Sequence, residues 1–248
     1  MKILLTTPNE IMKERLHEFF DPALKNLPDW YKNLSDKKLS TVNKCPAFIW
    51  TFKTSYLIRT PCDIMIKKTG DQILFEPLNR AVMKIDFHDI EYQMSKEQYG
   101  DYFAVKVEYR MSIKTSEPVK ALFLSPFQMY PENNKLFTSA SGVIPYVHKN
   151  TPLNIFLFFH KQTIIDLLQK YDNEFVIYKG TPIALLYFPT ETLPKIEVKI
   201  GDHGENMLHE EHLTLKEPSI KHLSRYFDKW KERNVLGKLI WRYLLWRR

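Results

Sequence analysis

The feature that most constrains this chain is a dense series of apolar segments between residues 136 and 189. Continuous apolar runs at residues 153–159 and 175–178 are rich in β-branched and aromatic side chains, and Pro, Asn and Gly bound them. Short bounded runs of this kind favour buried strands over helices. We therefore predict a mainly β (α+β) fold, an antiparallel β-barrel or sandwich with peripheral N-terminal helices and a C-terminal helical arm.

A turn interrupts the last apolar run at residues 179–183. Gly180 can adopt a positive φ without the clash that a Cβ would cause, and Pro182 fixes its own φ. The two residues predict a tight structural turn, which we interpret as the hairpin that closes the core barrel.

The residues before this core also carry strand patterns. Residues 42–77 indicate a series of strands, including CPAFIWTF at 45–52, with a hairpin turn at residues 68–71. Polar and apolar side chains alternate between residues 81 and 110, as in half-buried antiparallel strands. Residues 9–36 have apolar side chains at helical spacing, broken by prolines, and predict short helices packed on the sheet. The first residues predict an edge strand.

Three segments in a fixed order carry a family resemblance: SGVI at 141–144, LNIFLFF at 153–159 and YKGTPIALLYFP at 178–189. Four upstream segments fit the same pattern: LPDWYKNL at 27–34, KCPAF at 44–48, SYLIRTPCDI at 55–64 and MSIKTSEPVKALFLSPF at 111–127. Together they resemble an uncharacterised family of phage, other viral and bacterial proteins, a domain of unknown function. The resemblance covers most of the chain and implies a viral protein.

A fainter similarity points to a particular barrel. The GVI segment, a strand and the later KGTPIA segment resemble the closing part of the β-clip barrel of deoxyuridine triphosphatases and deoxycytidine triphosphate deaminases. Those enzymes have an Asp and a Tyr just after the first element, whereas Pro145, Tyr146 and Val147 follow it here. The resemblance therefore implies a β-clip-like fold without the nucleotide hydrolase activity.

The net charge of +7 is concentrated at the C-terminal end. Residues 219–248 contain nine basic and two acidic side chains, so the first 218 residues are neutral, with 27 of each sign. No apolar run is long enough to span a membrane, and the first residues lack a signal-peptide pattern. We expect a cytoplasmic location in the host cell and, if the phage interpretation holds, a place in the virion.

The C-terminal segment is a basic amphipathic arm. Residues 1–190 form the predicted β-rich core, 191–218 a linker or extended arm, and 219–248 the helical arm. Such an arm can dock on another protein subunit, lie on an anionic membrane, contact nucleic acid or fold back on its own sheet. The predicted partner-binding residues are Tyr226, Trp230, Arg233, Ile240, Trp241, Arg242, Trp246, Arg247 and Arg248.

Residues that could carry chemistry are sparse. The two cysteines, Cys45 and Cys62, fit neither a disulfide framework nor a zinc pattern, and no glycine-rich phosphate loop is present. An iron site would combine His88 and Asp89 or Glu91 with His148 or His160. Because adjacent residues of a strand point to opposite faces, His88 and Asp89 are unsuited to share an ion. We expect no catalytic residue, no metal and no cofactor.

The sequence therefore predicts a non-catalytic structural or interaction protein, in its most economical version a phage or viral virion component that docks through the C-terminal arm. The alternative is an enzyme or binding module for a small ligand on a barrel fold, resembling a nucleotide hydrolase or an iron-dependent oxygenase. Fold alone does not decide between these classes.

Overall fold

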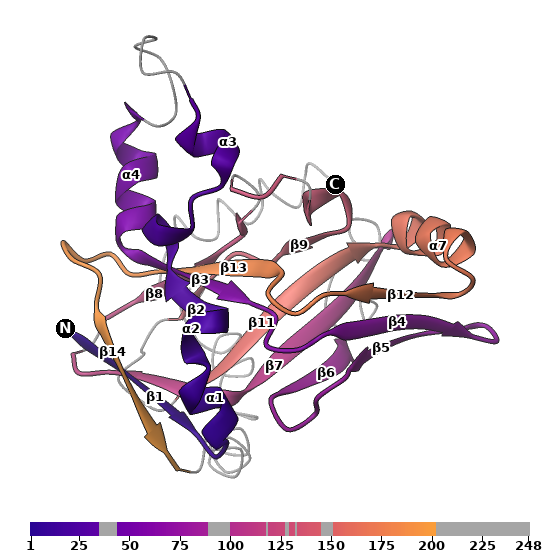
Figure 1. Ribbon diagram of the computed structural model, residues 1–248, viewed down its shortest axis with the longest axis horizontal. Helices are drawn as coiled ribbons and strands as arrows, with labels where there is room; N and C mark the ends of the chain where they lie inside the picture. The colour runs from indigo at the N-terminus through magenta and orange to yellow at the C-terminus, as the bar shows by residue number, and fades with distance from the viewer. Residues whose placement is uncertain are drawn as a thin grey trace, which may run out of the picture. The chain divides into compact units, whose positions relative to one another are not determined.

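The computed structural model describes residues 1–34, 44–88, 100–117, 119–126, 129–131, 133–144 and 151–201. These residues belong to one compact unit, Met1–His203. Their secondary structure is mainly β, as predicted, and the strands form three open sheets (Figure 1).

The largest sheet has six strands, here called the first sheet. Its path is β14 (Lys195–Ile200), β1 (Lys2–Thr7), β7 (Tyr102–Thr115), β11 (Thr151–His160) and β9 (Phe137–Ser139), and β6 (Met83–His88) pairs with β7 off this path. Every pairing in it is antiparallel except that of β1 with β14, which is parallel.

The two smaller sheets are antiparallel throughout. The second sheet contains β10 (Gly142–Ile144), β8 (Ala121–Leu124), β13 (Pro182–Tyr187), β3 (Ser55–Arg59) and β2 (Phe20–Pro22). The third sheet contains β12 (Glu174–Ile177), β4 (Ile64–Thr69) and β5 (Gln72–Pro77).

Short helices precede, connect or follow the strands. They are α1 (Glu10–Glu14), α2 (Leu16–Phe19), the 3-10 turn η1 (Ala23–Asn26), α3 (Asp29–Lys32), α4 (Pro46–Lys53), the 3-10 turn η4 (Asn133–Lys135) and α7 (Lys161–Lys170).

The main core lies between the first sheet and the other two. It combines Val107 and Ile155 of the first sheet with Ile58 and Ile183 of the second and Ile66 of the third, all fully or almost fully buried. Along each of these strands, side chains that point into the core alternate with side chains that point away from it. The arrangement is a sandwich, and the strands of the described ranges do not close into a barrel.

The second sheet is buried on both faces. Leu57 and Leu185 point away from the main core and pack with Tyr31 of α3 and Phe52 of α4 in a smaller cluster. A sheet covered on both sides needs apolar residues at successive positions, which explains the continuous apolar runs in β3 and β13.

The chain passes between the second and third sheets twice, at the same corner. Residues 60–63 connect β3 to β4, and residues 178–181 connect β12 to β13. The two crossings bond to each other: the Thr60 amide donates to the Thr181 carbonyl at 2.9 Å, and the Gly180 amide donates to the Thr60 carbonyl at 2.9 Å. Backbone groups that the sheets leave unpaired at the corner are thereby satisfied.

This corner corrects our interpretation of the Gly180 turn. The turn exists, and Gly180 has a φ of +86°. However, β12 pairs with β4 and β13 pairs with β3, so the turn carries the chain from one sheet to another and closes no hairpin. The other predicted turn is a true hairpin, with β4 and β5 joined at Gly70.

Three further predictions were wrong in detail. Residues 46–53 form helix α4, because Pro46 suits the first helical position and the aromatic rings of Phe48 and Phe52, four residues apart, then share the inward face. The core does not end at residue 190, since β14 extends the first sheet to Ile200. That strand also makes β1 an internal strand and not an edge.

Because Gly180 has a positive φ, a side chain introduced at this position should lower the stability of the folded protein. No atom lies within 4 Å of the place where its Cβ would be, so Gly180→Ala costs about 1 kcal/mol through backbone strain alone. A thermal melt should show a fall of roughly 2–4 °C.

Gly142→Ala is the matched control. Gly142 also has open space around it but has no positive φ, so this substitution should be neutral or slightly stabilising. Equal melting temperatures for the two variants would contradict the strained corner.

Candidate functional site

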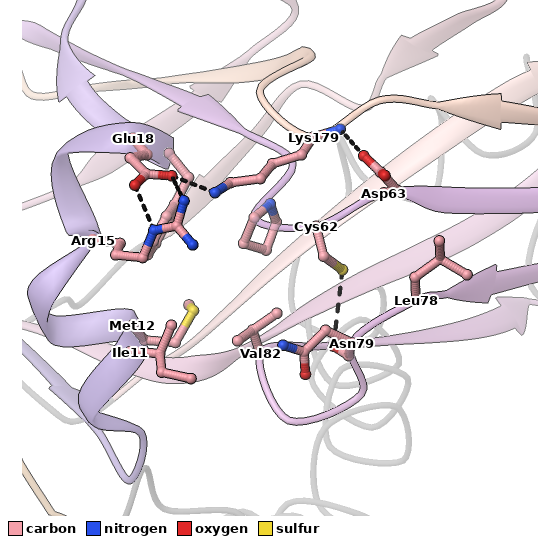
Figure 2. A pocket seen from close by; sticks show the side chains of 12 residues that line it. Ile11, Met12, Arg15, Glu18, Cys62, Asp63, Leu78, Asn79, Val82 and Lys179 are labelled. Carbon is pink, nitrogen blue, oxygen red and sulfur yellow. Dashed lines mark hydrogen bonds and ion pairs between the residues drawn. The ribbon is translucent and has the colours of Figure 1, made fainter.

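A pocket of about 240 Å³ lies beside the corner where the chain changes sheets (Figure 2). Helices α1 and α2 form one side of it, and the corner and the β5–β6 connection form the other. The lining residues are Ile11, Met12, Arg15, Glu18, Phe19, Pro61, Cys62, Asp63, Leu78, Asn79, Val82 and Lys179.

The pocket is apolar at its base and at two points of its rim. Met12, Phe19 and Val82 are almost fully buried and continue the main core. Ile11 and Leu78 are instead more than half exposed, at 51% and 59%. Exposed apolar side chains beside this apolar base favour a guest with an apolar group.

Asn9 fixes the helical side of the pocket. Its Oδ1 accepts the Ile11 amide at 2.9 Å and caps α1, while its Nδ2 donates to the Ala81 carbonyl at 3.1 Å. The N-cap residue therefore ties α1 to the β5–β6 connection. Ile11 lies on the first of these elements and Leu78 on the second, so the side chain of Asn9 holds the two apolar rim residues in place relative to each other.

The opposite end of the pocket is an ion-pair cluster. Glu18 accepts from Arg15 Nε at 2.5 Å and Nη2 at 2.8 Å, and also pairs with Lys179 Nζ. The hydrogen bonds from Arg15, then that from Lys179, lower the pKa of Glu18 to about 2. The carboxylate is thus ionised and fully engaged, and neither cation is left without a partner.

The corner itself supplies the remaining polar groups. Asp63 Oδ1 accepts the Lys179 backbone amide at 2.5 Å, and the Cys62 thiol donates to the Asn79 carbonyl at 3.8 Å. Burial raises the pKa of Cys62. A thiol held protonated is a poor nucleophile, so Cys62 is a buried structural residue.

This arrangement suits the binding of a guest. Arg15, Glu18 and Lys179 bond to one another, and the Cys62 thiol is engaged with the Asn79 carbonyl. The volume lies below the roughly 300–1,000 Å³ of usual small-molecule sites, which suits a guest about as large as one side chain.

A second pocket of about 380 Å³ is lined by three cationic side chains, Arg80, Lys84 and Arg110, together with Phe75 and Ile85. Lys84 pairs with Asp86 at 3.0 Å, and Glu76, which also lines this pocket, pairs with Lys67 at 2.7 Å. We regard it as the weaker candidate.

The structure tests few of the predicted site residues. All nine predicted partner-binding residues of the arm lie outside the described residues, as do Asp89, Glu91 and His148. His160 is described, and its ring lies 4.5 Å from that of Tyr102. Within the described ranges, no group of three His, Cys, Asp or Glu side chains could hold a metal ion. Gly180 and Pro182 lie at the corner beside the pocket.

The sequence analysis missed the pocket entirely. Its lining comes from four separate segments and contains no motif, so only the tertiary structure brings Arg15, Glu18 and Lys179 together. The one signal in the sequence was the Gly180 turn. We predicted its position in the chain correctly, but it connects two sheets and is not the hairpin that we expected.

No protein-family model and no curated protein matches the sequence. The resemblances described above therefore stay predictions. In the part of the chain that the structure describes, no helix is long and apolar enough to cross a membrane.

The burial of Cys62 predicts unequal thiol reactivity. A disulfide reagent at neutral pH should modify half-exposed Cys45 about tenfold or more faster than Cys62, because little Cys62 thiolate forms and the pocket walls cover it. Absorbance of the released thiol should show two phases. The slow phase must vanish in Cys62→Ser; its persistence there would contradict the assignment.

The ion-pair cluster predicts a pH dependence of stability. The pKa of Glu18 is about 2 in the folded protein, below about 4.3 in the unfolded chain. Its contribution to the free energy of unfolding is therefore present above about pH 4.3 and is lost as the pH falls towards 2. The effect is small, because solvent screens this partly exposed cluster.

Urea unfolding of the wild type and Glu18→Gln at several pH values should show a difference that shrinks over this window. Lys179→Met, which removes one of the two donors, should move the loss to higher pH. A constant difference between wild type and Glu18→Gln would be inconsistent with the assigned pKa.

Proposed function

We propose that this protein is a non-catalytic interaction protein that docks on other protein subunits. The observation that supports this function best is the pocket beside the corner, which has apolar rim residues exposed to solvent and polar groups already bonded to one another. A site whose ion pairs are already formed and whose apolar rim is exposed offers binding energy to an apolar group.

The guest that fits the pocket is one apolar side chain of a partner. Burial of a leucine-sized side chain contributes about 1.5–3 kcal/mol, which corresponds to roughly ten- to hundredfold in affinity. Anchors of this kind, seated in a pocket and surrounded by a polar rim, dominate many interfaces between proteins. The Arg15–Glu18–Lys179 cluster forms such a rim on one side.

The C-terminal arm is the second docking element of this proposal. Its basic and aromatic residues favour an exposed partner surface, and the resemblance to phage and viral proteins makes a virion component the most economical version. In that version the core contributes the pocket, and residues 219–248 reach a neighbouring subunit.

Leu78→Asp tests the proposal in the source of the protein. The substitution places a charge at the pocket rim, where 59% exposure of the native side chain keeps the effect on folding small. On a density gradient the wild-type chain should co-sediment with larger assemblies, and the variant should be at least about tenfold depleted from them.

Tyr171→Asp is the control, because Tyr171 has a similar exposure of 50% and follows α7, away from the pocket lining. It should co-sediment like the wild type. A wild-type chain that sediments only as a monomer, or a Leu78→Asp chain that assembles normally, would refute docking through the pocket.

A further inference from the structure

Four exposed apolar side chains gather on η1, α3 and α4, the elements that cover the outer face of the second sheet. They are Leu24, Trp30, Ile49 and Trp50, here called the Trp surface, and each is between 40% and 46% exposed. In Figure 1, α3 and α4 project from the sheets as a pair. The pocket proposed above for docking uses none of these residues.

The Trp surface stands on a packed base. Tyr31 contacts Phe52 edge-on with ring centroids 5.7 Å apart, and Phe52 contacts Phe48 at 5.9 Å. The indole N–H of Trp30 donates to the Met129 carbonyl at 2.8 Å. The inward rings of these helices thus pack on one another, and the partly exposed ring of Trp30 is fixed to the same base through its N–H and its contact with Tyr31.

Lysines surround the Trp surface. The described residues of 23–34 and 44–53 contain Lys25, Lys32, Lys44 and Lys53, all exposed, and Asp29 is the one acidic residue there. Since the first 218 residues are neutral in total, positive charge is locally enriched at this surface. Lys53 Nζ also lies 5.4 Å from the ring centroid of Trp50, so charge and aromatic surface are in contact.

We propose that the Trp surface docks on an anionic phospholipid bilayer. Indole rings prefer the headgroup boundary of a membrane, and lysines beside them bind lipid phosphates while their aliphatic stems stay in apolar contact. Helix α4 has eight residues, which is about 12 Å of helix and far less than the roughly 30 Å hydrocarbon core. It therefore lies in the interface and does not span the membrane.

Two features favour a lipid surface over a protein partner. The Trp surface is carried by projecting helices and not by a pocket, so it can enter the headgroup layer of a membrane without a preformed cavity in the partner. Its excess of lysine complements the continuous negative charge of a phosphatidylserine-containing surface, to which each lysine adds attraction.

The first experiment measures vesicle binding of the full-length chain. Co-sedimentation with phosphatidylcholine vesicles, with and without phosphatidylserine, should show binding to the anionic vesicles that is at least about tenfold tighter. Raising the salt concentration from about 0.1 M to about 0.5 M should weaken it. Ile49→Ser/Trp50→Ser should reduce the affinity at least about tenfold with little change in melting temperature.

Tyr178→Ser is the matched control. Among the described residues outside the Trp surface, Tyr178 is the most exposed large apolar residue, and its substitution should leave vesicle binding unchanged. Equal losses in the two variants would mean that general surface hydrophobicity, and not the Trp surface, binds the vesicles.

A local probe separates the Trp surface from the basic C-terminal arm. In a Cys45→Ser background, Ile49→Cys carries an environment-sensitive fluorophore, and buried Cys62 is left unlabelled under native conditions. Anionic vesicles should shift the emission of this label to the blue. The same label at Ile165→Cys, on exposed helix α7, should not respond.

Three outcomes would overturn the proposal. The chain does not bind anionic vesicles; or it binds them with the label at position 49 unchanged, so that another segment is responsible; or the label responds to a protein partner and not to lipid. Because Leu78 lies outside the Trp surface, failure of this test leaves the result of the Leu78→Asp experiment unaffected.

Discussion

The paired crossing between the second and third sheets is the constraint on which the rest of the structure depends. Residues 60–63 and residues 178–181 both connect the second sheet to the third, and they lie side by side. Hydrogen bonds between the two segments replace the hydrogen bonds that neighbouring strands of one sheet would make. A chain that changes sheets alone would bury unpaired amides, at a cost of about 1–3 kcal/mol each. Tyr109 of the first sheet secures the same corner, since its buried hydroxyl donates to the Arg59 carbonyl at 2.7 Å.

The two candidate surfaces follow from this geometry. The crossings place Cys62, Asp63 and Lys179 opposite α1 and α2, and these residues together line the pocket. The second sheet must also bury its outer face, and α3 and α4 cover Leu57 and Leu185 there. Helices that bury one side of themselves on a sheet display the other, and that side is the Trp surface.

Much of the sheet structure could be predicted from the sequence because burial alone produces its pattern. The strand at 153–159, the strand at 175–178 and the turn at Gly70 are local features, and the structure contains all three. Helix α4 could not be predicted from its aromatic residues, which suit strands equally well until a sheet face is present for Phe48 and Phe52 to cover. The strands on either side of the Gly180 turn pair with strands that are far away in the sequence, and no residue of the turn specifies that pairing.

The same distinction explains why function was harder to predict than fold. Catalytic and metal sites need particular side chains at particular spacings, so they leave motifs, and the motifs tested here lacked the required residues or spacing. A docking pocket needs only apolar surface that folding leaves exposed, and Ile11 and Leu78 carry no signal in the sequence that separates them from core residues. Their exposure becomes informative only in the folded protein, where they line the same pocket as buried Met12 and Val82 and extend the apolar surface of the pocket to the solvent.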